Sequence, residues 1–169
     1  MTVVDLLKGL KEFITEEVAS EITLQKEITD PTDNVEYVNP YVGLITLPHR
    51  NFIPVDFQAP NILIGFTVGN EKDPEHTIMI RMVCTVYGGN TEFGETNLPD
   101  ETGYLDLLNL IEKIKSKLIQ KAVLDEGAVD KDFLYGIYDE QLTYPYWYGY
   151  IQFPMQLPID HSQMFSEFL

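Results

Sequence analysis

The chain has 169 residues, of which 44% are hydrophobic, and its 27 acidic and 11 basic residues give a formal net charge of −16 at pH 7. This length and apolar content predict one domain over residues 1–169 with its own core, and argue against wholesale disorder. The excess of acids argues against nucleic-acid binding and against docking on anionic membranes, because both depend on Lys and Arg.

The cysteine content and the N-terminus indicate the compartment. Cys84 is the only cysteine, so a disulfide framework and a thiolate metal site are absent. It lies in the apolar run TIMIRMVCTVY, where we interpret it as a small buried hydrophobe rather than a reactive thiol. The start, MTVVDLLKGLKEF, lacks a signal-peptide pattern, and no apolar run approaches the roughly 20 residues that cross a bilayer. We therefore expect a soluble protein in a reducing cytosol.

In the first half, apolar residues at three- and four-residue spacing predict an amphipathic helix over about residues 2–19. Residues 31–60 follow as a loop-rich insertion in which YVGLITLP has the composition of a strand. NILIGFTVG and HTIMIRMVCTVYGG alternate in polarity around the polar NEKDPE, which predicts an antiparallel hairpin. The stretch GGNTEFGETNLPDETG is a long acidic loop, and such loops in small domains are usually functional or mobile.

In the second half, a helix is predicted from residue 104 to about residue 122, with lysines toward its C-terminal end that complement the helix dipole. FLYGIYDEQ and YPYWYGYIQFPMQLP predict two more strands joined by a short turn, and residues 159–169 form an amphipathic C-terminal tail. This order predicts an α+β fold, a mainly antiparallel sheet with two main helices on one face. The expected buried stripe of the second helix is Tyr104, Leu107, Leu108, Ile111, Ile114 and Leu118.

Catalytic and metal-binding motifs are not apparent. His49, His76 and His161 lack the spacing of zinc ligands, and the acids near residues 125–132 lack the pattern of a calcium loop. The serines do not form a nucleophile elbow, and YGGNTEFG lacks the lysine of a phosphate-binding loop. A carboxylate pair for glycoside hydrolysis stays open, since 27 acids make some pair inevitable. We expect no enzyme, no cofactor and no metal.

The stretch from Tyr144 to Pro158, YPYWYGYIQFPMQLP, begins with five aromatic rings in seven residues. Strand alternation puts Trp147 and the later apolar residues on a core face, and Tyr146, Tyr148 and Tyr150 on the opposite face. Exposed tyrosines are enriched where proteins meet. A base-stacking platform would need Arg and Lys, which this stretch lacks. A core strand with a half-covered outer face is the favoured interpretation, and a sugar-stacking platform stays open. Pro154 and Pro158 each lack a backbone donor, which favours an edge strand or the strand's exit.

Two stretches of the second half match the motifs of a known family. GYLDLLNLI is similar to a G-[WY]-x-D-[LV]-L-N-L-I helix, and PYWYGYI is similar to a P-Y-W-[FY]-G-x-[IV] strand that follows it at about this distance. With the strands ILIGFTVG and IRMVCTVYGG, they make the chain resemble the tail terminator, or tail completion, proteins of bacteriophages and prophages. The matched residues are Gly103, Tyr104, Asp106, Leu108, Asn109 and Ile111 in the helix, and Pro145, Tyr146, Trp147, Gly149 and Ile151 in the strand.

The resemblance implies a homo-oligomeric ring, expected to be a hexamer, that caps the tail tube, stops its polymerisation and joins it to the head connector. The implied partners are other copies of the chain, the tail tube protein and the connector protein, while DNA passes through without being bound. The implied location is the neck end of the virion tail, after assembly in the host cytoplasm. The alternatives are another head–tail joining or neck protein and, outside this class, a carbohydrate-binding or small hydrolytic domain.

Two surfaces are candidates for these contacts. Ring closure needs one patch to meet a different patch on the next subunit. For this interface we expect a contribution from Tyr146, Tyr148 and Tyr150 and, in the 31–60 insertion, from Phe52 and Phe57. We expect the acidic loop at the lumen or the tube-facing surface, where negative charge would let DNA slide; its residues are Glu92, Glu95, Asp100 and Glu101.

Overall fold

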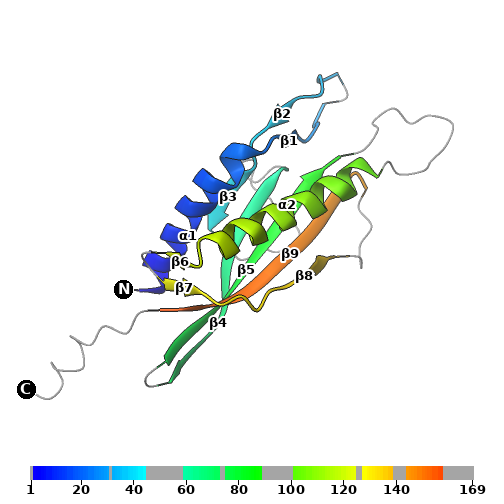
Figure 1. Ribbon diagram of the computed structural model, residues 1–169. Coiled ribbons are helices and arrows are strands. Elements are labelled where there is room, and N and C mark those ends of the chain that lie inside the picture. The colour runs from blue at the N-terminus through cyan, green and yellow to red at the C-terminus, as the bar shows by residue number, and fades with distance from the viewer. Residues whose placement is uncertain are drawn as a thin grey trace, which may run out of the picture.

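The computed structural model describes residues 2–30, 32–44, 59–72, 75–88, 101–124, 127–138 and 144–157. Figure 1 shows a curled sheet with two helices, α1 (Val3–Glu17) and α2 (Thr102–Gln120), on one of its faces. The predicted α+β fold is therefore confirmed. Both helices lie within two residues of their predicted bounds, and none of the helices among the described residues is long and apolar enough to span a membrane.

The sheet is mixed, although most of its pairs are antiparallel. Its strands run in the order β3-β4-β5-β9-β7-β6, and β8 also pairs with β9. The hairpin β4–β5 and the pairing of β8 with β9 follow the prediction, while β3 pairs parallel to β4. The strands are β3 (Tyr41–Leu44), β4 (Asn61–Lys72), β5 (Glu75–Tyr87), β6 (Val123–Leu124), β7 (Gly127–Val129), β8 (Leu134–Ile137) and β9 (Tyr146–Gln156).

A short connection follows α1 before the chain enters the sheet. A 3₁₀ turn (Ala19–Glu21) leads to a separate two-stranded ribbon of β1 (Leu24–Gln25) and β2 (Tyr37–Val38). The side chain of Asn39 ties this ribbon to the end of α1, because its amide donates to the carbonyls of Ala19 and Ile22 at 2.8 Å each. The 31–60 insertion therefore contributes β2 and β3.

The start of α1 follows from its sequence. Thr2 and Asp5 form a capping box, in which the Thr2 hydroxyl accepts from the Asp5 N–H at 3.2 Å and the Asp5 carboxylate accepts from the Thr2 N–H at 2.8 Å. The Thr2 hydroxyl also donates to the Asp5 carboxylate at 2.7 Å, and this hydrogen bond, followed by the one from the Thr2 N–H, lowers the pKa of Asp5. The cap sets the helix so that Leu6, Leu10 and Ile14 are fully buried against the sheet.

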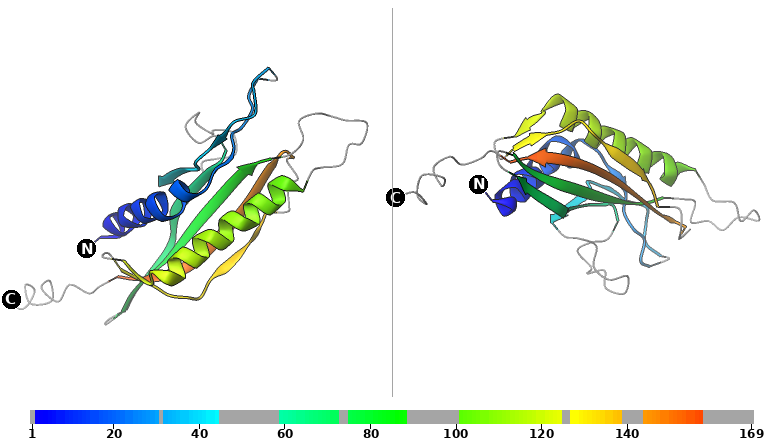
Figure 2. Two further views of the ribbon diagram at one scale, coloured as in Figure 1. Left: turned by 45° about the horizontal axis from the view of Figure 1, so that its top comes forward. Right: turned by 90° about the horizontal axis from the view of Figure 1, so that it is seen from below.

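The core lies between the helices and the inner face of the sheet, which we define as the face that α1 and α2 cover (Figure 2). On β9, Ile151, Phe153 and Met155 are fully buried there, as the alternation predicted. Cys84 of β5 is buried in the same layer, where burial raises the pKa of its thiol to about 12, so its interpretation as a small hydrophobe is confirmed.

The buried stripe of α2 differs in part from the prediction. Tyr104 is 40% exposed and Leu108 is half-buried, whereas Gly103 and Leu110 are buried. The helix is turned so that its smallest residue, Gly103, faces the sheet at the point where the Trp147 ring lies. This rotation moves the bulky Tyr104 to the flank of the helix.

The position of Pro154 rules out the edge-strand alternative and leaves the strand's exit, since β9 ends two residues later; Pro158 lies outside the described residues. β9 is a central strand that pairs with β5 along its whole length, and not an edge strand. The Pro154 carbonyl accepts from the Asp130 N–H at 3.0 Å, so the backbone of Pro154 faces away from β5. On that side β8 pairs with β9 as far as Gln152 and β7 pairs from Met155 onward. The missing N–H therefore falls between two partners and costs β9 no ladder bond to β5.

Candidate protein interface

The outer face of the sheet, opposite the helices, carries the tyrosines that the sequence singled out. Tyr146, Tyr148 and Tyr150 are half-buried there. Each stands directly opposite a buried residue of β5, in the pairs Tyr146–Tyr87, Tyr148–Thr85 and Tyr150–Val83. The structure thus brings the three predicted interface tyrosines together in one row, with their rings in contact with neighbours as well as with solvent.

Tyr146 is bound within the subunit. Its hydroxyl donates to a carboxylate oxygen of Glu27, and its ring meets that of Tyr87 edge-on at 5.2 Å between centroids. The other oxygen of the same carboxylate accepts from the Ala59 N–H at 3.3 Å. Burial, and then the hydrogen bond to Glu27, raise the pKa of Tyr146, while burial and the Glu27 charge raise that of Tyr87.

The sequence could not predict the hydrogen bond between Tyr146 and Glu27, since the two residues are 119 positions apart. Glu27 belongs to the segment between α1 and β2, and this segment runs from the helix side of the sheet to its outer face. Glu21 pairs with Lys113 of α2 on the helix side, and six residues later Glu27 reaches the outer face. This segment therefore connects the helix layer to the tyrosine row.

Tyr150 lies under a cation from the neighbouring strand. The guanidinium carbon of Arg81 is 5.5 Å from the ring centroid of Tyr150, and the Arg81 Nε donates to Gln152 at 3.0 Å. The ring centroid of Tyr138, just after β8, is 5.0 Å from that of Tyr150. An arginine next to aromatic rings is typical of protein–protein contacts, where Arg and Tyr are both enriched.

A second aromatic cluster lies on the inner face at the N-terminal end of β9. Trp147 donates from its indole Nε1 to the Gly88 carbonyl at 2.9 Å, and its ring centroid is 5.9 Å from that of Tyr104 and 6.3 Å from that of Tyr144. A Cβ placed on Gly103 would come within 2.2 Å of the indole nitrogen. Only glycine fits at that helix position.

The two family-like motifs therefore pack on one another. Besides the contact between Gly103 and Trp147, a Cβ on Gly149 would lie 2.8 Å from the Ile111 side chain and 3.2 Å from that of Leu107. Both glycines thus allow α2 to lie close against β9. Asp106 of the helix motif is half-buried, and desolvation raises the pKa of its carboxyl.

The stems of the acidic loop meet at the same place. The Gly88 and Gly103 backbones are so close that a Cβ on Gly88 would come within 2.8 Å of the Gly103 Cα. Glu101, which precedes α2, is exposed. The remaining predicted residues of the two surfaces lie outside the described part of the chain: Phe52, Phe57, Glu92, Glu95 and Asp100.

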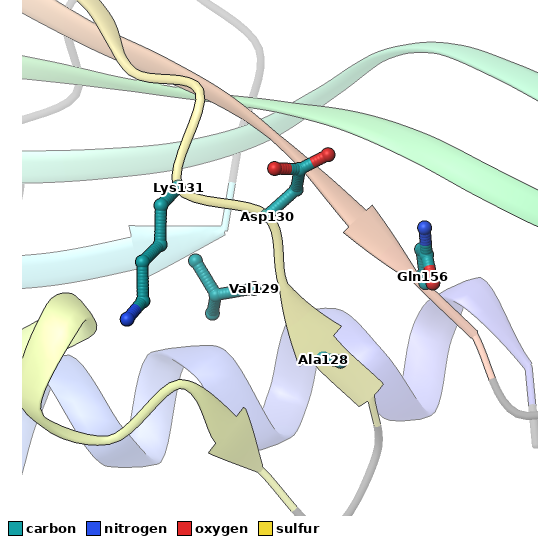
Figure 3. A pocket seen from close by; sticks show the side chains of 5 residues that line it. All are labelled: Ala128, Val129, Asp130, Lys131 and Gln156. Carbon is teal, nitrogen blue, oxygen red and sulfur yellow. The ribbon is translucent and has the colours of Figure 1, made fainter.

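Among the described residues we find no cluster of side chains that resembles a metal or catalytic site. They contain no group of three or more His, Cys, Asp or Glu side chains that could hold a metal ion. Figure 3 shows a depression at the C-terminal end of β9, lined by Ala128, Val129, Asp130, Lys131 and Gln156. The charged groups of Asp130 and Lys131 point away from each other there, so the lining does not converge on a common point.

The lysines of α2 are used in ion pairs. Lys113 lies 2.9 Å and Lys117 3.2 Å from the Glu21 carboxylate, and Lys115 lies 2.7 Å from Glu112. The Lys115 ammonium also lies 4.1 Å from the ring centroid of Tyr135. Lys115 pairs within α2, as expected for a lysine that serves its own helix, whereas Lys113 and Lys117 tie α2 to the 3₁₀ turn after α1.

Comparison with known proteins places the chain in no family: no family model and no curated protein sequence matches it.

Proposed function

We propose that this protein is a structural virion assembly protein of the tail terminator kind. In this proposal, copies form a ring, expected to be a hexamer, that caps the tail tube, stops its polymerisation and joins it to the head connector, and the protein is not an enzyme. It would work at the neck end of the virion tail after assembly in the host cytoplasm. Another head–tail joining protein is the nearest alternative.

The observation that carries the proposal is the contact between the two motifs on which the resemblance rests. Gly103 of the helix motif lies against Trp147 of the strand motif, and Gly149 of the strand motif lies against Ile111 of the helix motif. The two motifs thus pack closely on one another, and this contact explains why a glycine in each motif occurs together with the bulky residues of the other. A chance match of two separate stretches would not require such a contact.

The outer face supports contact with a protein more than with a sugar. A sugar platform needs a flat, accessible ring, but the Tyr146 hydroxyl is bound to Glu27 and its ring meets Tyr87 at 74°. The rings of Tyr138 and Tyr150 are tilted by 43° to each other. Half-buried tyrosines around an arginine are instead typical of the centre of a protein interface.

The test is a tube assembly assay. The purified protein should shorten the tubes formed by the tail tube protein of the same phage, and electron microscopy should show a ring on one tube end. Tubes of unchanged length, without a terminal ring, would contradict the proposed function. Binding of an oligosaccharide at the tyrosine row would favour the carbohydrate-binding alternative.

The tyrosine row is tested within the same assay. Tyr148→Asp combined with Tyr150→Asp should weaken ring formation without unfolding the subunit, because two new charges would be buried in the contact. Ser116→Asp combined with Gln120→Asp adds the same charge at two exposed positions of α2 and serves as the control. An unchanged oligomer mass for the tyrosine double variant would remove this row from the interface.

The acidic loop is tested separately. Replacing Glu92, Glu95 and Glu101 by Gln and Asp100 by Asn should leave the fold intact and impair tube capping or DNA passage, because the like charge that repels DNA is removed. Normal yields of infectious particles from such a mutant phage would discard a role for the loop.

A further inference from the structure

β8 forms an open edge of the sheet. It pairs with β9 and, among the described residues, with no other strand. The Tyr138 N–H donates to the Tyr148 carbonyl, so the alternate residues Gly136 and Leu134 also face β9. The backbone N–H and C=O groups of Tyr135 and Ile137 therefore point away from β9, toward the side of the sheet where another strand could be added.

This edge lacks the charges and prolines that often protect an edge strand, although its four-residue length is a protective feature in itself. Residues 133–138 read FLYGIY, six residues without charge or proline in a chain that is 22% charged. Leu134 is 56% exposed and Tyr135 47% exposed. Natural edge strands are usually interrupted by Lys, Pro or a bulge, because a bare apolar edge pairs with other chains. The short length of β8 limits such pairing to a few hydrogen bonds, which suits an assembly that must form on demand.

The opposite border of the sheet is β3, which is also four residues long. Tyr41 donates its N–H to the Pro60 carbonyl beside β4 at 3.0 Å, so the backbone groups of Val42 and Leu44 point outward. Leu44 is 37% exposed at the end of this strand. Among the described residues β3 pairs with β4 alone, so β3 and β8 are two edges of equal length, each with exposed apolar side chains, on opposite borders of one sheet.

We propose that β8 of one copy pairs with β3 of the next copy, so that the sheet continues from subunit to subunit around the ring. This inference rests on the proposed function and names the contact that the ring would use. Pairing of β8 with a second β8 would be isologous and would end at a dimer, so it could not by itself build a ring. A contact between two different edges is heterologous, and it gives a closed ring when the rotation from one copy to the next divides a full turn.

The test uses the full chain and one lysine on each edge. Leu134→Lys blocks the β8 edge and Leu44→Lys blocks the β3 edge, since a charged edge residue opposes strand addition. Val123→Lys is the matched control, because Val123 is 69% exposed on β6, a border strand that the proposal does not use. Sedimentation velocity up to millimolar concentration then measures the oligomer mass, with circular dichroism to verify folding.

The expected result has two parts. Wild type and Val123→Lys form the ring, while Leu134→Lys and Leu44→Lys each stay monomeric. A mixture of the two edge variants gives a dimer and nothing larger, because it contains one intact β8 edge and one intact β3 edge. Rings from either edge variant alone would overturn the inference, and so would a mixture that stays monomeric.

Backbone amide exchange gives a second readout that does not depend on the variants. The Gly136 amide faces β9 and should be protected in the monomer and in the ring, whereas the amides of Tyr135 and Ile137 should gain protection only in the ring. Equal exchange of Tyr135 and Ile137 in both states would overturn the inference. A wild-type chain that is monomeric at millimolar concentration would also overturn it, while tube capping in the assay above would still uphold the proposed function.

Discussion

The two faces of β9 differ in burial and in the kind of contact that they make. Toward the helices, Ile151, Phe153 and Met155 are fully buried, whereas on the outer face Tyr146 and Tyr150 are half-buried and bound to Glu27 and Arg81. Apolar packing holds the inner face, and aromatic and polar contacts that leave part of each ring in solvent hold the outer one. Substitutions on the inner face should therefore change stability, and substitutions on the outer face should change assembly more than stability.

The largest expected effect is on the inner face. Phe153 is fully buried and its ring lies 5.4 Å from that of Phe133, so Phe153→Ala should lower the free energy of unfolding by about 3–5 kcal/mol. Tyr150→Ala removes a ring that is only half-buried and should cost less than half as much. Urea unfolding followed by circular dichroism measures both. Equal losses would mean that the outer face is as much a part of the core as the inner face.

The next effect concerns the contact between α2 and β9. Gly103→Ala forces a methyl group against the Trp147 indole and should lower the free energy of unfolding by about 1–3 kcal/mol. Because Trp147 is the only tryptophan, its fluorescence spectrum should shift at the same time. Gly69→Ala is the control: the nearest atom to its Cβ is the edge of the Phe66 ring at 3.3 Å, and the residue is exposed. A Gly103→Ala protein with wild-type stability and fluorescence would contradict this packing.

The contrast between the faces also shows what the sequence could predict. Alternation in YPYWYGYIQFPMQLP was sufficient to assign Ile151, Phe153 and Met155 to the core, because side chains on a strand alternate whatever the neighbouring strands are. The same pattern could not predict Glu27 as the partner of Tyr146, or Arg81 above Tyr150. Those contacts depend on which strands become neighbours and on the path of the segment after α1.

The errors have the same origin. Pro154 was expected on an edge strand or at the strand's exit; β9 is a central strand, and the change of partner from β8 to β7 near its end gives the proline a place. Tyr104 was expected in the core because it fits the helical spacing, but spacing alone does not fix the rotation of a helix to better than one residue. The contact of Gly103 with Trp147 fixes it, and that contact is tertiary.

On the outer face, the hydrogen bond between Tyr146 and Glu27 gives the next smaller effect. Tyr146→Phe should lower the free energy of unfolding by about 1.5 kcal/mol, the low end for a bond to a charged group, because both side chains are only partly buried. Tyr150→Phe is the control, since the Tyr150 hydroxyl has no hydrogen bond with any described residue, and it should be close to neutral. If the two variants were equally stable, the Glu27 contact would have no part in holding the outer face.

Glu21 should give the smallest effect, and it lies on the helix side. Hydrogen bonds from Lys113, and then from Lys117, lower the pKa of Glu21 below its usual 4.5. A depressed carboxyl pKa stabilises the fold above the unfolded pKa, and this stabilisation is lost as the pH falls through the folded pKa. The stability difference between wild type and Glu21→Gln should thus be constant above about pH 4.5 and shrink below it.

The dependence of stability on salt should distinguish the exposed ion pairs of Glu21 from the hydrogen bond between Tyr146 and Glu27 on the outer face. The Glu21 contribution should shrink in high salt, because solvent-exposed ion pairs are screened, whereas the hydrogen bond of Tyr146 to Glu27 is partly buried and should change less. Unfolding curves of Glu21→Gln and Tyr146→Phe at low and high salt measure the two directly. A Glu21 contribution that persisted in high salt, or grew as the pH fell, would show that Glu21 does not stabilise the fold through its ion pairs with Lys113 and Lys117.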